Sequence, residues 1–312
     1  MKVYSREEFA EEFGDKEWIA PCDKIIAIAS EDNTYVEIIE ETASFGGSAW
    51  TTLHFKKTSK LVKEARREGK RNVFLTLAGK CDLNLVPGIS GAGIEEIKII
   101  ENEIHVTYAG LGGGGVGASY SRGMAEGVKR VEIHASGGGS KYSRATVVLP
   151  RMERLVLGVD DTDNKEEGAT WSLTHNLGCE IQKKGLGEYI YHSIVQLYPK
   201  NPDKTQNCVS VSLGFASKKE KKNEIIEFAQ KYLEKNTLSD QTGLATYGRF
   251  FINEDLKKFS REAKESIVTI EKAYNVARKN DVNLFQITGK RGLIGALAAI
   301  PYYDKPDQGV LI

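Results

Sequence analysis

The run Leu155-Val156-Leu157-Gly158-Val159-Asp160-Asp161-Thr162-Asp163 decides the fold of the second half of the chain. Its first five residues are apolar or small, and they predict a buried strand. The three carboxylates that follow repel one another unless cations or hydrogen-bond donors hold them. Because Mg²⁺ takes few protein carboxylates and fills its shell with water and phosphate oxygens, Asp160, Asp161 and Asp163 predict a metal–phosphate site at the strand end. An aspartate-rich turn that caps the next helix stays the alternative.

Helices and strands alternate after this run, which predicts an α/β or α+β domain with helical cover on its sheet. The patterns indicate helices at 169–184, 219–235, 256–279 and 292–300, and strands at 189–197, 208–213 and 283–287. The charged segment Pro150–Arg154 marks a domain boundary. We therefore expect two domains, 1–150 and 151–312.

The first half contains most of the glycines, and it predicts an α+β domain with a glycine-rich mixed sheet. Apolar and β-branched runs indicate strands at 24–29, 35–40, 50–55, 72–77, 103–109, 130–134 and 145–149. Helices are expected near Ser59–Gly69 and Val116–Val128. The basic run Lys63–Arg71 has two interpretations, a solvated helix face or a patch that touches phosphate.

Glycine clusters separate these strands, and one of them predicts a ligand-binding loop. The segment Gly110–Gly117 follows a predicted strand and precedes a helix of small residues, so its backbone N–H groups can converge on an anion. We assign cofactor binding to four successive glycines, Gly112, Gly113, Gly114 and Gly115. A tight turn explains the cluster equally well, as it does for Ser136–Ser140.

Composition excludes several classes of protein. The chain carries 43 basic and 43 acidic side chains, so its net charge of zero argues against a generally basic nucleic-acid coat. The N-terminus has no apolar signal-peptide core, and no apolar run is long enough for a membrane span. Four cysteines lie far apart in the sequence and predict neither a zinc site nor a disulfide framework. A cytoplasmic protein without membrane contact is expected.

Three segments in the same order resemble the archaeal synthetase that attaches agmatine to an anticodon cytidine of an isoleucine tRNA. The first is Gly158–Asp163 with its continuation Gly168-Ala169-Thr170. The second, Asn201–Asn207, is similar to that family's Asn-x-Pro-x-Lys-Thr-x-Gly-Asn loop without its glycine. The third, Arg291–Ile300, is similar to its Arg-Gly-Leu-Ile-Gly helix start. The resemblance implies an ATP-binding domain in this half.

That resemblance also implies roles for individual residues. The aspartates would hold Mg²⁺ and ATP phosphates, with Asp161 in the chemistry. Thr170 falls on the family's threonine for phosphate transfer, and a helix N-cap is the alternative. Lys204 would reach phosphate oxygens. Binding roles fall to the side chain of Asn207 and to the helix start at Arg291 and Gly292.

The whole layout, with a glycine-rich first half before the aspartates, resembles methanogenesis marker protein 11. Together the resemblances predict a Mg²⁺–ATP-dependent phosphoryl or nucleotidyl transfer. The acceptor would be a protein or coenzyme of the methane-forming system. Two alternatives stay open: a tRNA-modifying enzyme, and a non-catalytic ATP-binding assembly factor. We rank tRNA below the others because the chain is neutral and ends soon after the last helix, before the family's C-terminal nucleic-acid modules.

Overall fold

The structure is a computed structural model of the chain, and it describes residues 1–137 and 140–311. It divides into two compact units, unit 1 (Met1–Met152) and unit 2 (Glu153–Ile312), and the break falls inside the charged segment 150–154. The expected class of mixed helices and strands is confirmed, and every pair of neighbouring strands in the sheets is antiparallel.

Unit 1 contains two antiparallel sheets. The larger sheet has the order β1-β9-β10-β8-β7-β6, and the smaller has the order β2-β3-β5-β4. The strands of the larger sheet are β1 (Lys2–Ser5), β6 (Gly79–Lys80), β7 (Ala92–Ile100), β8 (Glu103–Leu111), β9 (Arg130–Ala135) and β10 (Tyr142–Pro150). Those of the smaller sheet are β2 (Lys24–Ala29), β3 (Tyr35–Glu41), β4 (Val62–Glu68) and β5 (Arg71–Leu77).

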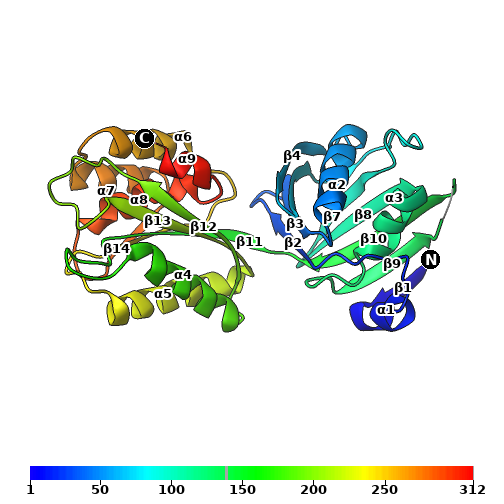
Figure 1. Cartoon of the computed structure of the whole chain (residues 1–312), viewed down its shortest axis with the longest axis horizontal. Helices are drawn as coiled ribbons and strands as arrows, with labels where there is room; N and C mark the ends of the chain where they lie inside the picture. Colours follow the sequence, from blue (N-terminus) through cyan, green and yellow to red (C-terminus); the bar gives the residue numbers. More distant parts are fainter. Residues whose placement is uncertain (138–139, 312) are drawn as a thin grey trace. The chain divides into compact units, whose positions relative to one another are not determined.

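One apolar core joins the two sheets of unit 1. Buried residues of the smaller sheet, such as Ile38 and Phe74, share it with Val106 and Val147 of the larger one. The helices of this unit are α1 (Arg6–Phe13), α2 (Phe45–Thr58), the short α3 (Gly112–Val116) and the π-helical turn η1 (Gly117–Ser121). Helix α2 packs on β4, β5 and β7, and Figure 1 labels it beside β4 and β7.

Unit 2 has one five-stranded antiparallel sheet with the order β12-β13-β11-β14-β15. Its strands are β11 (Glu153–Asp160), β12 (Glu188–Gln196), β13 (Val209–Ser217), β14 (Gly243–Tyr247) and β15 (Asn283–Gln286). The apolar run of the opening segment forms β11, the central strand, so Leu155, Leu157 and Val159 are buried between neighbours on both sides. The expected buried strand is confirmed.

Helices cover both faces of this sheet (Figure 1). They are α4 (Thr170–Lys183), η2 (Lys219–Lys221), α5 (Lys222–Asn236), α6 (Glu254–Glu265), α7 (Ile270–Lys279), α8 (Gly292–Ala299), η3 (Ile300–Tyr302) and α9 (Pro306–Val310). Helices α4 and α5 lie on one face. Helix α8 lies on the other, packed against β11, β13 and β14, with α6 and α7 outside it. None of the helices in the described ranges is long and apolar enough to cross a membrane.

Two predictions in unit 1 are wrong. The expected strand 50–55 lies inside α2, where Ser44 caps the helix and Ser48, Thr51 and Phe55 are buried at helical spacing. The side chains of 50–55 favour a strand, and the cap and the one-sided burial override that preference. The expected helix 59–69 is instead β4, an edge strand whose charged side chains discourage pairing with another chain. The interpretation of Lys63–Arg71 as a helix face is therefore also wrong.

Other element predictions need smaller corrections. The expected helix 116–128 ends at Ser121. The expected helix 256–279 is two helices, α6 and α7, because the chain is non-helical at 266–269 and Thr269 caps the second helix. Strands β1, β6, β7 and β14 and helices α1 and α9 were not predicted. The turn expected at Ser136–Ser140 includes residues 138–139, which lie outside the described residues.

Candidate active site

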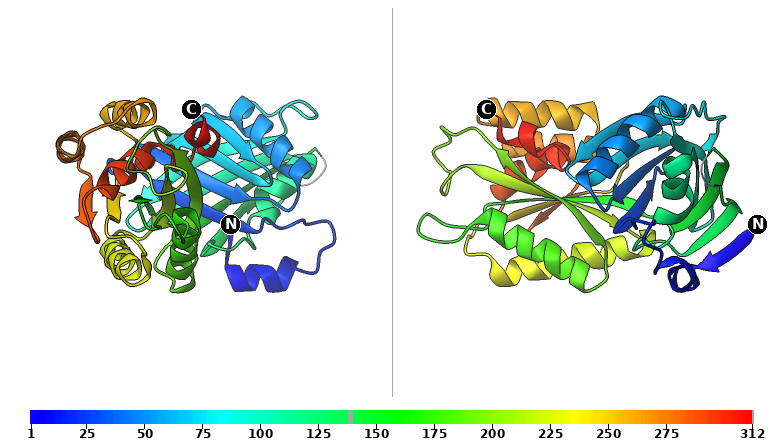
Figure 2. Two further views of the ribbon diagram at one scale, coloured as in Figure 1. Left: turned by 60° about the vertical axis from the view of Figure 1, so that its left-hand side comes forward. Right: turned by 45° about the vertical axis from the view of Figure 1, so that its right-hand side comes forward.

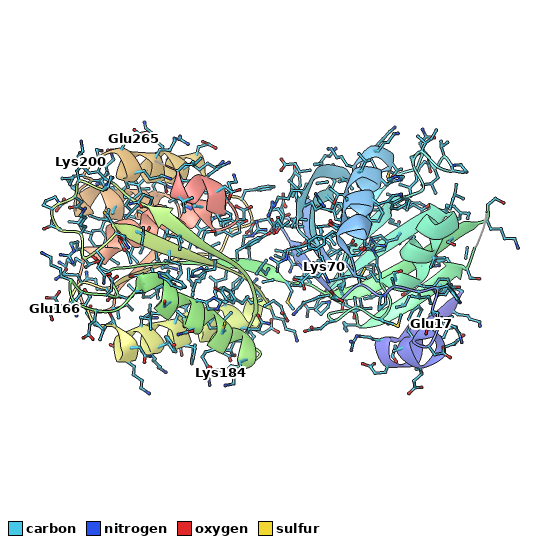
Figure 3. The ribbon with its side chains drawn as sticks, in the orientation of Figure 1. Glu17, Lys70, Glu166, Lys184, Lys200 and Glu265 are labelled. Atoms are coloured by element: carbon cyan, nitrogen blue, oxygen red, sulfur yellow. The ribbon has the colours of Figure 1, made fainter. Side chains whose placement is uncertain are left out.

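The antiparallel order of unit 2 brings four segments to one edge of its sheet. Strand β11 ends there at Asp160, and β14 begins there at Gly243, its partner. The loop 197–208 between β12 and β13 reaches the same edge, since Gln196 pairs with Val209. Figures 1 and 2 show this loop and the loop 161–169 extending beyond the same end of the sheet. Figure 3 labels one residue of each there, Lys200 and Glu166.

The carboxylate of Asp160 lies against the start of α8. A Cβ atom added to Gly295 would lie 1.7 Å from Asp160 Oδ2, and one added to Gly292 would lie 2.8 Å from the Asp160 carbonyl oxygen. The two glycines of the Arg-Gly-Leu-Ile-Gly segment therefore let the helix approach the strand end. Burial, reinforced by the charges of Asp161 and Asp163, raises the pKa of Asp160 well above its usual value.

Asp161 adopts a left-handed backbone conformation, with φ of 54°. Its N–H donates to Asp160 Oδ1 at 2.8 Å, and its carbonyl oxygen accepts from the Thr242 hydroxyl at 2.6 Å. Asp and Asn tolerate this conformation better than most residues, which suits the turn. Arg291 Nε donates to Asp161 Oδ2 at 2.9 Å. Burial raises the pKa of Asp161, and the bond from Arg291 opposes that rise.

Asp163 is bound by the loop 197–208. The hydroxyl of Thr205 donates to Asp163 Oδ1 at 2.8 Å. Asp163 is buried, with 8% of its surface exposed, and it does not line the pocket beside Asp160 and Asp161. The third aspartate therefore connects the two loops.

Thr170 is the first residue of α4, and Ala169 is the N-cap, so the interpretation of Thr170 as the cap is wrong. The Thr170 hydroxyl oxygen accepts from the N–H of Thr162 at 3.3 Å and from its hydroxyl at 3.1 Å. Thr170 is buried, with 3% of its surface exposed. In this arrangement it fixes the turn of the aspartate segment, and its predicted part in phosphate transfer stays a prediction.

The loop 197–208 carries the other predicted residues. Lys204 lines the pocket, and its ammonium donates to the Pro199 carbonyl at 2.7 Å. Asn207 is exposed and lies outside the pocket lining. Gln206, where the resembled family has glycine, donates to the carbonyls of Asn164 at 3.0 Å and Gly168 at 3.2 Å. Gln206 thus connects the loop 197–208 to the loop 161–169.

The N–H groups at the start of α8 already have protein acceptors. The Gly292 N–H donates to the Gln241 carbonyl at 2.9 Å, and the Leu293 N–H donates to the Lys290 carbonyl at 3.1 Å. The predicted anion site at this helix start therefore depends on the Arg291 side chain and not on the backbone.

A small pocket of about 70 Å³ collects the charged groups of this edge. Asp160, Asp161, Lys204 and Arg291 line it together, and so does Asp203, which the sequence did not single out. The missed residues of this edge also include Thr205. Both lie in the loop Asn201–Asn207 that carried the resemblance, and this position was their only sequence signal.

The predicted Mg²⁺ site can be tested against these residues. Within residues 1–137 and 140–311, no three His, Cys, Asp or Glu side chains converge on one metal position. Mg²⁺ needs only one or two carboxylates when phosphate and water supply the other oxygens. Asp160 and Asp161 line the pocket side by side. This pair fits a Mg²⁺ ion that arrives with a nucleotide better than a resident metal.

The predicted glycine loop of unit 1 is not a loop, because β8 runs to Leu111 and α3 begins at Gly112. Packing explains several of its glycines. A Cβ atom would lie 2.8 Å from Ser143 Oγ at Gly115 and 2.9 Å from the Gly91 carbonyl oxygen at Gly114. Gly112 has a positive φ of 57°, whereas a Cβ atom at Gly113 meets nothing within 4 Å. Gly112, Gly113 and Gly114 line a cavity in unit 1, and Gly115 does not.

Comparison with known proteins yields two kinds of similarity. The chain is 47% identical over 276 residues to the "uncharacterized protein MJ0921" of Methanocaldococcus jannaschii, which covers 88% of this chain and 92% of that protein. A family model described as the TiaS TCKD domain matches residues 156–230.

The second similarity is to TiaS, the 2-agmatinylcytidine synthetase that acts on an isoleucine tRNA. The Pyrococcus horikoshii protein is 30% identical over 153 residues, which is 47% of this chain and 35% of TiaS. The crystal structure of TiaS in complex with this tRNA and ATP matches with a TM-score of 0.44 and 25% identity, over 48% of this chain and 36% of that one. The chain thus spans about a third of the length of TiaS.

Proposed function

We propose that this chain, which belongs to the family of the uncharacterized protein MJ0921, binds ATP with Mg²⁺ in unit 2 and transfers a phosphoryl or nucleotidyl group to an acceptor. The observation that carries the proposal is the pocket at the end of β11, where Asp160 and Asp161 meet Arg291 and Lys204. The match of residues 156–230 to the TiaS TCKD model, and the 30% identity to TiaS over 47% of this chain, support the same assignment.

Each side chain of the pocket has a role in this proposal. Asp160 and Asp161 would hold Mg²⁺, which neutralises phosphate charge when it is bound. Arg291 binds phosphate oxygens with a planar fork, and Lys204 binds them as a point charge. Each cation already has a protein partner that a nucleotide would replace: Arg291 donates to the Asp161 carboxylate, and Lys204 donates to the Pro199 carbonyl. Gly292 has no side chain, so the end of β11 can lie against the start of α8.

The contact between Arg291 and Asp161 makes metal and arginine competitors for one carboxylate. In the structure Arg291 Nε holds Oδ2 of Asp161 at 2.9 Å. A Mg²⁺ ion held by Asp161 would compete with Arg291 for this carboxylate, which would leave the guanidinium to bind phosphate oxygens. Metal and nucleotide would then strengthen each other's binding.

The similarity to TiaS supports a second candidate, modification of a tRNA by the same chemistry. The resemblance to the methanogenesis marker family favours instead a protein or coenzyme acceptor of the methane-forming system. In the third alternative, the ATP-binding assembly factor, nucleotide binds without turnover. Phosphate contacts make tRNA binding steeply dependent on salt, so titration at several ionic strengths detects the tRNA candidate.

The test of the proposal is an analysis of the products formed from ATP labelled at the α- or γ-phosphate. The full chain is incubated with Mg²⁺ and an archaeal cell extract as the source of acceptor, beside an Asp161→Asn sample. AMP with pyrophosphate indicates nucleotidyl transfer, and ADP with labelled acceptor indicates phosphoryl transfer. ATP that binds and is returned intact contradicts the transferase assignment and favours the assembly factor. Equal turnover by Asp161→Asn contradicts the site.

A further inference from the structure

Unit 1 contains a cavity of about 710 Å³ that the ATP assignment does not use. This volume is within the usual range for cavities that enclose small organic ligands. Its walls come from α2, the segment 87–92, α3 and η1, all within unit 1. Arg122 is the only Asp, Glu, Lys or Arg among its described lining residues.

Arg122 is buried, and hydrogen bonds to Glu40 and Gly117 hold its guanidinium in place. Its Nε and Nη2 donate to the two carboxylate oxygens of Glu40 at 2.8 Å each, and its Nη1 donates to the Gly117 carbonyl at 2.8 Å. The guanidinium lies over the ring of Tyr108, 4.3 Å from the centroid, and Tyr108 also donates to Glu40 at 2.8 Å. These bonds use three of the five N–H groups of the guanidinium. For the other two, no acceptor lies within residues 1–137 and 140–311.

An aromatic pair lines the same cavity. The rings of Trp50 and His54 are stacked, with centroids 3.8 Å apart and planes 18° apart. The Gly91 N–H donates to His54 Nδ1 at 2.9 Å, so the neutral ring carries its proton on Nε2. Burial, aided by the charge of Lys57, lowers the pKa of His54, which keeps the ring neutral. The pair offers flat aromatic rings and carries two N–H groups, Trp50 Nε1–H and His54 Nε2–H.

The charge of the cavity limits what it can hold. Glu40 already neutralises Arg122, so the pair contributes no net charge, and the described lining offers no second cation. A triphosphate would leave most of its charge uncompensated there. Burial raises the pKa of the Cys22 thiol in this wall to about 12, so the thiol adds no charge to the cavity at neutral pH.

We propose that this cavity is a second binding site, for a planar aromatic small molecule that is neutral or carries one negative charge. Its ring stacks on the Trp50–His54 pair, and one acceptor oxygen bonds to the remaining N–H groups of Arg122. The described residues that line it all lie in unit 1, whereas those that line the ATP pocket lie in unit 2. The inference stands whether or not unit 2 binds nucleotide.

Two glycines provide a matched test. A Cβ atom meets nothing within 4 Å at Gly113, which lines the cavity, or at Gly46, which does not. Both are helical and exposed, and neither has a positive φ, so Leu at either position is compatible with the fold. The probe is 1-anilinonaphthalene-8-sulfonate, an aromatic monoanion, titrated into the full chain and followed by its fluorescence.

We expect one saturable site per chain. Affinity should fall at least about tenfold in Gly113→Leu, because the new side chain occupies the cavity, and should stay unchanged in Gly46→Leu. ATP with Mg²⁺ should not displace the probe, and Asp161→Asn should bind it normally. Unsaturable binding, equal affinity in Gly113→Leu and the wild type, loss in Gly46→Leu, or displacement by ATP would each overturn the proposal.

Discussion

Gly295→Ala changes one hydrogen into a methyl group at the point where α8 meets the aspartate cluster. The new Cβ atom would lie 1.7 Å from Asp160 Oδ2, whereas such contacts essentially never fall below 3.0 Å. Either the Asp160 carboxylate rotates and loses the bond from the Asp161 N–H, or the helix moves away from the strand. Both responses alter the pocket, so the substitution should weaken nucleotide binding as well as lower stability.

The magnitude follows from two opposing terms. Overpacking costs about 1–3 kcal/mol, and replacing glycine by alanine in a helix returns about 1 kcal/mol. We expect a net loss of about 0–2 kcal/mol in the free energy of unfolding, with at least about a tenfold loss of Mg²⁺–ATP affinity. Urea unfolding followed by circular dichroism measures the first quantity, and calorimetric titration measures the second.

Two further alanine substitutions, at Gly158 and Gly46, serve as controls for Gly295→Ala. At Gly158 the Cβ atom would lie 1.9 Å from the Ala296 carbonyl oxygen, a backbone atom that cannot rotate away, so Gly158→Ala should be the most destabilising of the three. At Gly46 nothing lies within 4 Å, so Gly46→Ala should leave stability unchanged or higher and binding normal. A Gly295→Ala chain with wild-type stability and wild-type Mg²⁺–ATP affinity would refute the packing argument.

Three further predictions concern single contacts. Glu40→Gln leaves the buried Arg122 charge without its partner and should lower the free energy of unfolding by about 3–5 kcal/mol, measured in urea. Glu103, bonded to Lys129, has its pKa lowered to about 2 from 4.5. A depressed pKa stabilises the fold above the unfolded value, so Glu103→Gln should cost about 1 kcal/mol at pH 7 and progressively less as the pH falls from 4.5 towards 2. Gln206→Gly removes the Gln206 bonds between the two loops, leaves the Thr205–Asp163 bond, and should speed hydrogen exchange in the loop 161–169, with no change in β11.

The strongest sequence signals predicted the elements that carry the candidate site. A continuous apolar run predicted β11 as a buried strand, and the Arg-Gly-Leu-Ile-Gly start located α8. No local sequence pattern predicted that the loop 197–208 lies beside Asp160. That position depends on the strand order β12-β13-β11-β14, which is set by long-range pairing and leaves no local pattern.

Unit 1 was harder to predict because its local preferences conflict with its tertiary structure. The β-branched and aromatic side chains of 50–55 favour a strand, yet the residues form a helix whose buried face packs on two sheets. The glycines of α3 suggested a loop, whereas at Gly114 and Gly115 they allow close backbone packing. The buried Arg122–Glu40 pair joins residues 82 positions apart, so periodicity could not reveal it.

The most direct test of the ATP proposal compares Asp161→Asn with Glu166→Gln. Each substitution removes one negative charge from the loop 161–169. Of the two residues, only Asp161 lines the pocket. We expect Asp161→Asn to lower ATP affinity at least about tenfold with Mg²⁺, and to leave or raise it without Mg²⁺ because Arg291 is released. Glu166→Gln should match the wild type in both conditions. Equal Mg²⁺-dependent ATP binding by Asp161→Asn and the wild type would contradict the account.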